Sequence, residues 1–150
     1  MSWQDHPLRV MIVDDEAPMR ALVRATLQRS DRARVVAEAD SSFEQVAAGC
    51  TKAPQVVLLD QNLGGRIGTD LIGDILHTCP QAMIAVFSAL DPDIEEAPAL
   101  RAGAFTFYEK DVVTPALAQH LTEDYELFRR ALEGEAVWAP SAEQRRRVSA

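Results

Sequence analysis

The chain is best understood from one segment, Pro54-Gln55-Val56-Val57-Leu58-Leu59-Asp60. Its four consecutive apolar residues, bounded by Pro54 and by Gly64-Gly65, are typical of a strand buried on both faces, as in a parallel sheet. Asp60 then lies at the carboxyl end of a central strand, the edge of an open α/β sheet where ligands bind. A second apolar run, Val10-Met11-Ile12-Val13, ends in Asp14-Asp15-Glu16. The two acidic strand ends predict a pocket that needs a hard divalent cation, for which Mg²⁺ is the best candidate.

The composition limits the class of protein. The chain has 150 residues, enough for one α/β domain but not for two, and its 47% hydrophobic and 25% charged residues are ordinary for a globular protein. The net charge of −8 argues against a large nucleic-acid or membrane surface. The first residues lack the pattern of a signal peptide and no stretch is long enough to span a membrane, so we expect a cytoplasmic protein.

The cysteines and histidines suggest no metal centre. Cys50 and Cys79 are predicted to be free structural thiols in a reducing cytoplasm, rather than a disulfide or a metal site. The three histidines His6, His77 and His120 are far apart and have no partner at ligand spacing.

Apolar runs alternate with helical patterns along the whole chain. The predicted strands are Arg9–Val13, Arg34–Ala39, Val56–Asp60, Met83–Ser88 and Phe105–Tyr108. The predicted helices are Pro18–Gln28, a helix capped by Ser41 or Ser42 that runs to about Cys50, Thr69–Thr78, about Asp93 to Arg101, and a last helix capped by Thr114, with Pro115 at its first position, and stopped by Gly134. Right-handed crossovers make this an α/β fold, a (βα)5 doubly wound parallel sheet with helices on both faces.

Two segments are expected to be irregular. Pro98 lies inside the fourth helix and predicts an unwound first half, because proline removes a hydrogen bond and clashes with the preceding turn. We place the domain at residues 8–133 and read 134–150 as a C-terminal tail or linker. Its run Arg145-Arg146-Arg147 is interpreted as a solvated tail rather than a nucleic-acid contact.

Polar residues at four strand ends form a recognisable set. They are Asp14 and Asp15, Asp60, Ser88 and Lys110. The chain has only two lysines, Lys52 and Lys110, against thirteen arginines. A lysine at this edge indicates a need for a compact point charge near a phosphate.

These residues, in order and at their spacing, resemble the receiver domain of bacterial two-component response regulators, over about Leu8 to Leu132. The matching pieces are Val13-Asp14-Asp15-Glu16, Leu58-Leu59-Asp60, Gly68, Ser88-Ala89, Ala102-Gly103-Ala104, Phe107 and Lys110. The resemblance implies the flavodoxin-like fold with strand order 2-1-3-4-5.

The resemblance also implies a role for each site residue. Asp60 looks like the phosphoacceptor. Asp15 and Asp60 would bind Mg²⁺ directly, together with the backbone carbonyl of Asn62, and Asp14 would act mainly through a bound water. Ser88 and Lys110 would contact phosphoryl oxygens, so that the domain catalyses its own Mg²⁺-dependent phosphoryl transfer and autodephosphorylation.

The resemblance further implies a conformational switch. Ser88 would move toward the phosphoryl group and Phe107 would fill the space behind it. The change would reach the face formed by the fourth helix, the fifth strand and the fifth helix.

Several positions depart from the family pattern. Gly64 stands where proline is usual, Asp111 follows the lysine in place of proline, and Ser88 and Phe107 replace the commoner Thr and Tyr. None of these changes removes an essential group. Leu90, two residues after Ser88, is apolar and is expected to shield the aspartyl phosphate from water.

The expected partners are a sensor histidine kinase or phosphotransfer protein, and either a downstream protein or a C-terminal output domain. A homodimer through the fourth helix, fifth strand and fifth helix is a further possibility, and no membrane or direct nucleic-acid contact is expected. The alternatives are a non-catalytic docking module of the same fold and the N-terminal part of a DNA-binding response regulator. A Mg²⁺ phosphohydrolase is disfavoured because Asp60-Gln61-Asn62 lacks a second acid, and a flavin mononucleotide carrier because Asp14-Asp15 would repel its phosphate.

Overall fold

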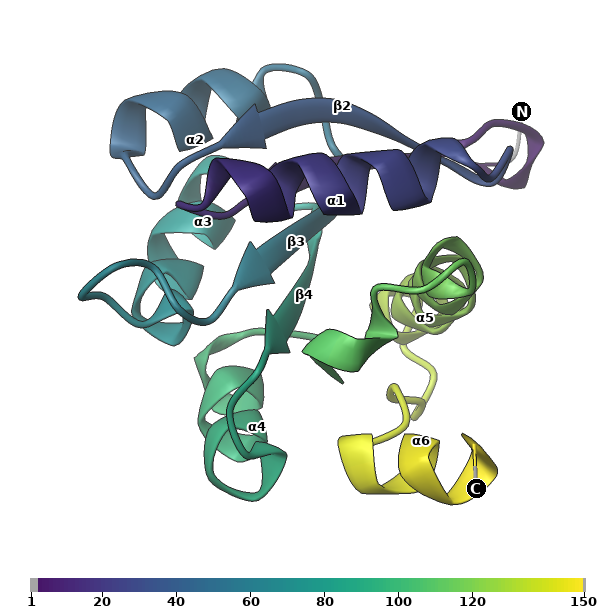
Figure 1. Cartoon of the computed structure of the whole chain (residues 1–150). Coiled ribbons are helices and arrows are strands. Elements are labelled where there is room, and N and C mark those ends of the chain that lie inside the picture. The colour runs from purple at the N-terminus through teal and green to yellow at the C-terminus, as the bar shows by residue number, and fades with distance from the viewer. Residues whose placement is uncertain (1–2, 150) are drawn as a thin grey trace.

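The computed structural model describes residues 3–149, which form one parallel sheet covered by helices (Figure 1). The sheet has the order β2-β1-β3-β4-β5, and all of its pairings are parallel. The strands are β1 (Leu8–Val13), β2 (Ala33–Ala39), β3 (Val56–Asp60), β4 (Met83–Ser88) and β5 (Thr106–Glu109). The helices are α1 (Ala17–Gln28), α2 (Phe43–Cys50), α3 (Ile72–Thr78), α4 (Pro92–Ala102), α5 (Leu117–Leu132) and α6 (Ala142–Ser149). The predicted flavodoxin-like fold and strand order are confirmed.

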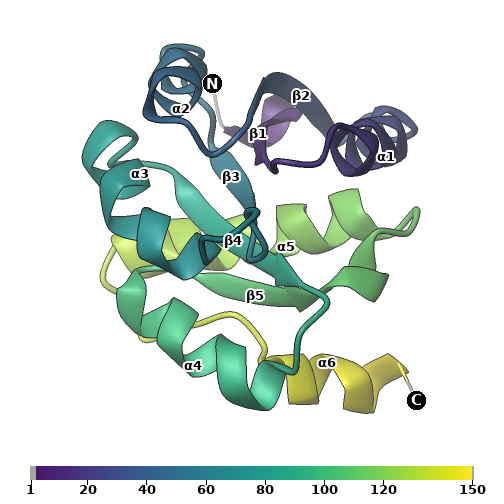
Figure 2. The same ribbon diagram turned by 60° about the vertical axis from the view of Figure 1, so that its left-hand side comes forward.

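Helices cover both faces of the sheet (Figure 2), and the core consists of two apolar layers, one on each face. On one face, side chains of α2, α3 and α4 cover strand residues such as Met11 and Leu59. On the other face, α1 and α5 cover residues such as Ile12 and Leu58. Strands β3 and β4 are buried along their whole length, as two-sided coverage requires.

Several predicted boundaries shift by a few residues. The predicted helix over Thr69–Thr78 begins with a 3-10 turn, Gly68–Leu71, and becomes α-helical only at Ile72. The last helix begins at Leu117 rather than at Pro115. The Thr114 hydroxyl accepts a hydrogen bond from the Ala116 N–H at 3.2 Å, so Thr114 caps a separate turn before the helix.

The prediction of an unwound first half for α4 is wrong, because α4 is continuous over eleven residues with Pro98 inside it. Its first turn is held by the Asp91 side chain, which accepts from the Asp93 N–H at 2.9 Å, and by its buried residue Pro92. Pro98 removes the partner of the Ile94 carbonyl, but Ile94 is 68% exposed and water can take that place.

The prediction of free thiols is also wrong, because Cys50 and Cys79 form a disulfide with a Cα–Cα distance of 5.7 Å. Cys50 is the last residue of α2 and Cys79 directly follows α3. These helices pack side by side on one face of the sheet, so their C-terminal ends meet although 29 positions separate them. Sequence spacing carries no signal of this proximity.

The segment read as a tail contains a helix that the sequence analysis did not predict. Helix α6 lies beyond β5, beside α4 (Figures 1 and 2). Val137 is partly buried, whereas Trp138 is 73% exposed. Over residues 3–149, no helix is both long and apolar enough to cross a membrane.

Candidate functional site

The polar strand ends meet at one edge of the sheet, as predicted. Asp14 follows β1, Asp60 ends β3, Ser88 ends β4 and Lys110 follows β5. The registers of neighbouring strands bring these ends into line, since Val13 lies opposite Leu59 and Asp60 lies opposite Phe87. A carboxylate is thus central, with an acid on one side and a hydroxyl and an ammonium on the other.

Lys110 is paired with Asp60. Its Nζ lies 3.3 Å from both Oδ1 and Oδ2 of Asp60, and 5.5 Å from the centre of the Phe87 ring. Asp60 is almost fully buried, and the Asn62 N–H donates to its Oδ1 at 3.1 Å. The ammonium therefore neutralises a carboxylate that the surrounding strands withdraw from water.

Asp14 is the most strongly perturbed group at this edge. Its side chain is 0% exposed, its Oδ1 accepts from the Glu16 N–H at 2.8 Å, and its Oδ2 has no hydrogen-bond partner. Burial, and to a lesser degree the neighbouring charge of Asp60, raise the pKa of Asp14 to about 6, while the Glu16 N–H acts in the opposite direction. A buried carboxylate oxygen without a partner indicates that a ligand belongs there.

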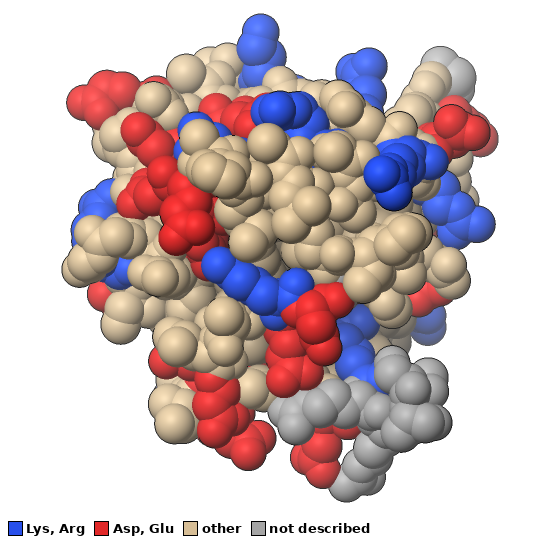
Figure 3. Space-filling model, in the orientation of Figure 1, with Lys and Arg blue, Asp and Glu red and all other residues tan. Residues whose placement is uncertain are grey.

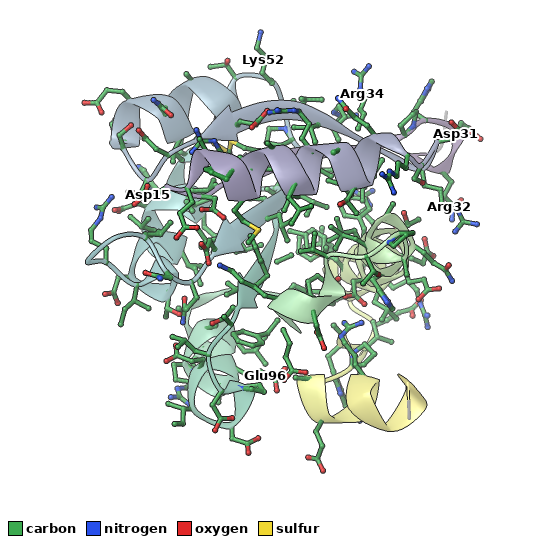
Figure 4. All side chains as sticks on the ribbon, in the orientation of Figure 1. Asp15, Asp31, Arg32, Arg34, Lys52 and Glu96 are labelled. Atoms are coloured by element: carbon green, nitrogen blue, oxygen red, sulfur yellow. A yellow bond between two sulfur atoms is a disulfide. The ribbon has the colours of Figure 1, made fainter. Side chains whose placement is uncertain are left out.

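Asp15 takes part in a different interaction. Its Oδ1 accepts from the Ser41 N–H at 2.8 Å and its Oδ2 from the Ser41 hydroxyl at 3.3 Å. Figure 4 shows Asp15 at the N-terminal end of α1, and Figure 3 shows acidic side chains gathered there, with basic ones beside them. Across the described residues, no three acids, cysteines or histidines are arranged around a common metal position. The hard oxygens of Asp14, Asp15 and Asp60 fit a divalent cation in kind, but Asp15 must leave Ser41 to join the other two.

The remaining predicted residues lie close by. The buried Ser88 hydroxyl accepts from the Leu90 N–H at 2.9 Å, so it is turned toward the β4–α4 connection. Phe107 is fully buried within the layer formed with α3 and α4. The Leu90 side chain is 52% exposed, and its shielding role stays a prediction.

Gln61 is a site residue that was not predicted from the sequence. This buried side chain links three elements, since its Nε2 donates to Thr69 Oγ1 at 2.9 Å and to Glu95 Oε2 at 2.5 Å. The Thr69 N–H in turn donates to Gln61 Oε1 at 2.9 Å. Gln61 therefore ties the residue after Asp60 to the first turns of α4, and its only signal in the sequence is a polar residue directly after a buried strand.

Gly68 matched the family pattern, and the structure supplies the reason. A Cβ atom at this position would lie 2.3 Å from the carbonyl oxygen of Asp60. The Gly68 N–H donates to the Gln61 carbonyl at 2.8 Å, which holds the two segments at this close approach. Only glycine fits there without moving the backbone of Asp60.

Comparisons with known proteins agree with this geometry. The family model described as "Response regulator receiver domain" matches residues 10–122. A nitrate/nitrite response regulator protein homolog of Haemophilus influenzae is 25% identical over 134 residues, which cover 89% of this chain and 61% of that protein. A protein-glutamate methylesterase/protein-glutamine glutaminase of Geobacter sulfurreducens is 30% identical over 85% of this chain and 35% of that protein. The chain thus spans less than two thirds of the length of these curated relatives.

Solved structures have the same fold. The receiver domain of NarL from Mycobacterium tuberculosis superposes with a TM-score of 0.71 at 24% identity, covering 81% of this chain and 98% of that one. A LuxR-family two-component response regulator from Aurantimonas sp. SI85-9A1 superposes with a TM-score of 0.67 at 25% identity, covering 89% and 91%. With a family match over residues 10–122 and the acidic edge in place, the chain belongs to the response regulator receiver domains of two-component signalling.

Proposed function

We propose that this receiver, residues 8–133, accepts a phosphoryl group on Asp60 and signals through the face formed by α4, β5 and α5. The observation that carries the proposal is the buried Asp60 carboxylate, held by Lys110 at 3.3 Å beside a second buried acid, Asp14. The donor would be the phosphohistidine of a sensor histidine kinase or of a phosphotransfer protein, which membership in two-component signalling implies. We place this reaction in the cytoplasm.

The chemistry follows from the arrangement of the charges. An Asp60 oxygen attacks the phosphorus atom, the bond from phosphorus to the imidazole nitrogen breaks, and the imidazole leaves. Lys110 remains close enough to offset the repulsion between the carboxylate and the phosphoryl oxygens. Ser88, buried at the neighbouring strand end, can turn its hydroxyl from the Leu90 N–H toward a phosphoryl oxygen. Removal of the phosphoryl group would use a water molecule at the same edge.

Mg²⁺ would be held by Asp15 and Asp60, by the carbonyl of Asn62, and through water by Asp14. When bound, it would neutralise the acidic edge during transfer. Asp15 has to give up its bonds to Ser41 for this role. Its removal should nevertheless matter most, because Asp15 would bind the ion directly whereas Asp14 would act through water. In a Mg²⁺ titration, we expect Asp15→Ala to weaken binding more than Asp14→Ala does, and the reverse order would show that the two roles are exchanged.

The signal would pass to α4 and β5 along two routes. Lys110 directly follows β5, and Gln61 connects the residue after Asp60 to Glu95 of α4. The receiving partner would be a downstream protein, an output domain or a second copy of the chain.

The test is chemical labelling with acetyl phosphate and Mg²⁺. We expect the mass of the wild-type chain to rise by one phosphoryl group, lost again on treatment with hydroxylamine, and peptide mapping to place it on Asp60. Asp60→Asn should remain unlabelled, while Asp70→Asn, a matched change at an exposed acid, should be labelled as the wild type is. Full labelling of Asp60→Asn would refute the proposal.

A further inference from the structure

Helix α6 lies on the face through which the receiver is proposed to signal. Ala142, its first residue, is almost fully buried, and its N–H donates to Glu96 Oε2 of α4 at 2.9 Å. Glu96 lies between the two helices (Figure 4). Arg145, one turn later, reaches β5 and α5. The helix therefore touches all three elements of the α4–β5–α5 face.

Arg145 occupies a site that is built for a guanidinium group. Its Nη2 lies 2.5 Å from Asp124 Oδ2 and 3.0 Å from Thr106 Oγ1, and its guanidinium carbon lies 4.7 Å from the centre of the Tyr108 ring. A planar cation stacked on an aromatic ring and paired with a carboxylate is the arrangement that arginine makes and lysine does not.

Asp124 is the central residue of this guanidinium site. It is 2% exposed, and it also accepts hydrogen bonds from the Thr106 hydroxyl at 2.9 Å and from the Tyr108 hydroxyl. Burial, with the charge of Asp124 next, raises the pKa of Tyr108 well above its usual range, so the phenol stays a donor. A buried carboxylate with only neutral donors is costly, and the site therefore favours a cation.

Grooves lie on both sides of α6. A groove of about 770 Å³ separates it from the start of α5, and one of about 370 Å³ lies on its α4 side. The 770 Å³ groove is lined by the acids Glu109, Asp111 and Glu123. The connection before α6 carries the exposed Trp138. The anchors described for this eight-residue helix are the Ala142–Glu96 bond and the Arg145 site, and a helix this short has little stability of its own once they are lost.

We propose that α6 is a detachable cap on the α4–β5–α5 face, with Arg145 filling the guanidinium site in cis until phosphorylation releases it for an arginine-bearing helix of a partner protein. The acidic lining of the groove complements a basic helix. The releasing signal rests on the function proposed for Asp60: Lys110, which pairs with Asp60, follows β5, and β5 carries Thr106 and Tyr108 of the site.

The cap is tested with the full-length chain and a labelled synthetic peptide that spans residues 137–150. We expect the peptide to bind Arg145→Ala at least ten times more tightly than the wild type, because the wild-type site is already filled. Arg101→Ala removes the same charge from an exposed position of α4 and should behave as the wild type. Arg145→Lys keeps the charge without the planar group, and its affinity for the peptide should lie between those of the wild type and Arg145→Ala. Adding Asp124→Asn to Arg145→Ala should abolish binding.

Hydrogen exchange shows whether the helix itself is released. Amides of residues 141–149 should exchange faster in Arg145→Ala, independently of protein concentration, while those of β1, β3 and β4 stay protected. Equal peptide binding to the wild type and to Arg145→Ala, or unchanged exchange over 141–149, would overturn the cap. Protection that rises with protein concentration would place α6 on a second copy and would overturn the cis assignment.

A separate experiment tests whether phosphorylation of Asp60 releases α6. With acetyl phosphate and Mg²⁺, exchange over 141–149 should increase in the wild type and not in Asp60→Asn. A phosphorylated Asp60 with unchanged exchange would overturn the release and leave the proposed function standing. An absence of label on Asp60 would overturn the proposed function, and the peptide measurements would still decide whether the cap exists.

Discussion

Asp14 is destabilising in its charged form, because its carboxylate is buried beside Asp60. Its pKa is about 6 in the fold, against an ordinary value of 3.8. The folded chain thus binds this proton more tightly than the unfolded chain, and the stability that the proton confers is lost as the pH rises from about 4 to 6. The loss is complete above pH 6 and amounts to about 3 kcal/mol.

Asp14→Asn should therefore stabilise the metal-free protein at pH 8. In urea unfolding with a chelator, we expect the free energy of unfolding to rise by up to about 3 kcal/mol at pH 8, with little difference at pH 4. Asp15→Asn, at the exposed neighbouring position, is the control and should have a smaller effect. A variant that is no more stable than the wild type at pH 8 would contradict the burial argument.

Substitution of Gly68 tests the close approach between its backbone and the carbonyl of Asp60 at the end of β3. Gly68→Ala places a Cβ atom against the Asp60 carbonyl and should lower the free energy of unfolding by about 2–3 kcal/mol, as overpacking does. Gly73→Ala is the matched control, because a Cβ atom at that position would meet nothing within 4 Å, and it should be neutral or stabilising by up to about 1 kcal/mol. Equal effects of the two changes in urea unfolding would exclude a special role for Gly68.

Substitution of Leu90 tests whether its side chain sets the lifetime of the phosphorylated form. If its side chain shields the aspartyl phosphate, Leu90→Glu should admit and orient water and speed dephosphorylation by roughly tenfold, part of the gain that a positioned general base supplies. The rate is measured with Mg²⁺ saturating both proteins. An unchanged or slower rate would mean that Leu90, which is 52% exposed, leaves the path to water open.

At the scale of elements, tertiary contacts in α4 override the local tendency of Pro98 to break the helix. Its first turns are fastened by Asp91, by the Gln61–Glu95 bond and by the Glu96–Ala142 bond, so the helix continues through Pro98. Pro98→Ala would restore the hydrogen bond to the Ile94 carbonyl. We expect it to raise the free energy of unfolding by about 1–3 kcal/mol, less than the full penalty because proline also restricts the unfolded chain.

Pro92→Ala is the control within the same helix. Proline is well tolerated at the first helical position, so this change should bring no gain in the same unfolding experiment. A Pro98→Ala variant that is no more stable than the wild type would show that the interior proline carries no penalty in α4.

At the scale of the whole molecule, the Cys50–Cys79 disulfide ties α2 to α3 at the edge of the sheet opposite the acidic site. A bridge over 29 positions should contribute about 3.5 kcal/mol by restricting the unfolded chain. Reduction should lower the free energy of unfolding of the wild type by this amount and leave Cys50→Ser/Cys79→Ser unchanged. Two reactive thiols in denaturant without reductant would contradict the bridge.

Local sequence pattern was sufficient to predict the five strands, their burial on both faces and the acidic edge of the sheet, because each of these features depends on residues that are close in sequence. The run Val56–Asp60 is apolar enough to require coverage on both faces, and a parallel sheet brings every strand end to one side. Asp14, Asp60, Ser88 and Lys110 could therefore be placed at one edge of the sheet from the parallel direction of the strands, whereas the strand order came from the family resemblance.

Only the tertiary structure decided the contacts between distant segments. The Cys50–Cys79 bridge, the bond from Asp15 to Ser41, the continuity of α4 and the docking of Arg145 on Asp124 each join residues whose separation in space depends on how several elements pack. The free energy that fixes these contacts arises from burial and pairing across elements, which no local pattern in the sequence reports. Sequence periodicity reports which face of an element is buried, but not which distant residue it meets there.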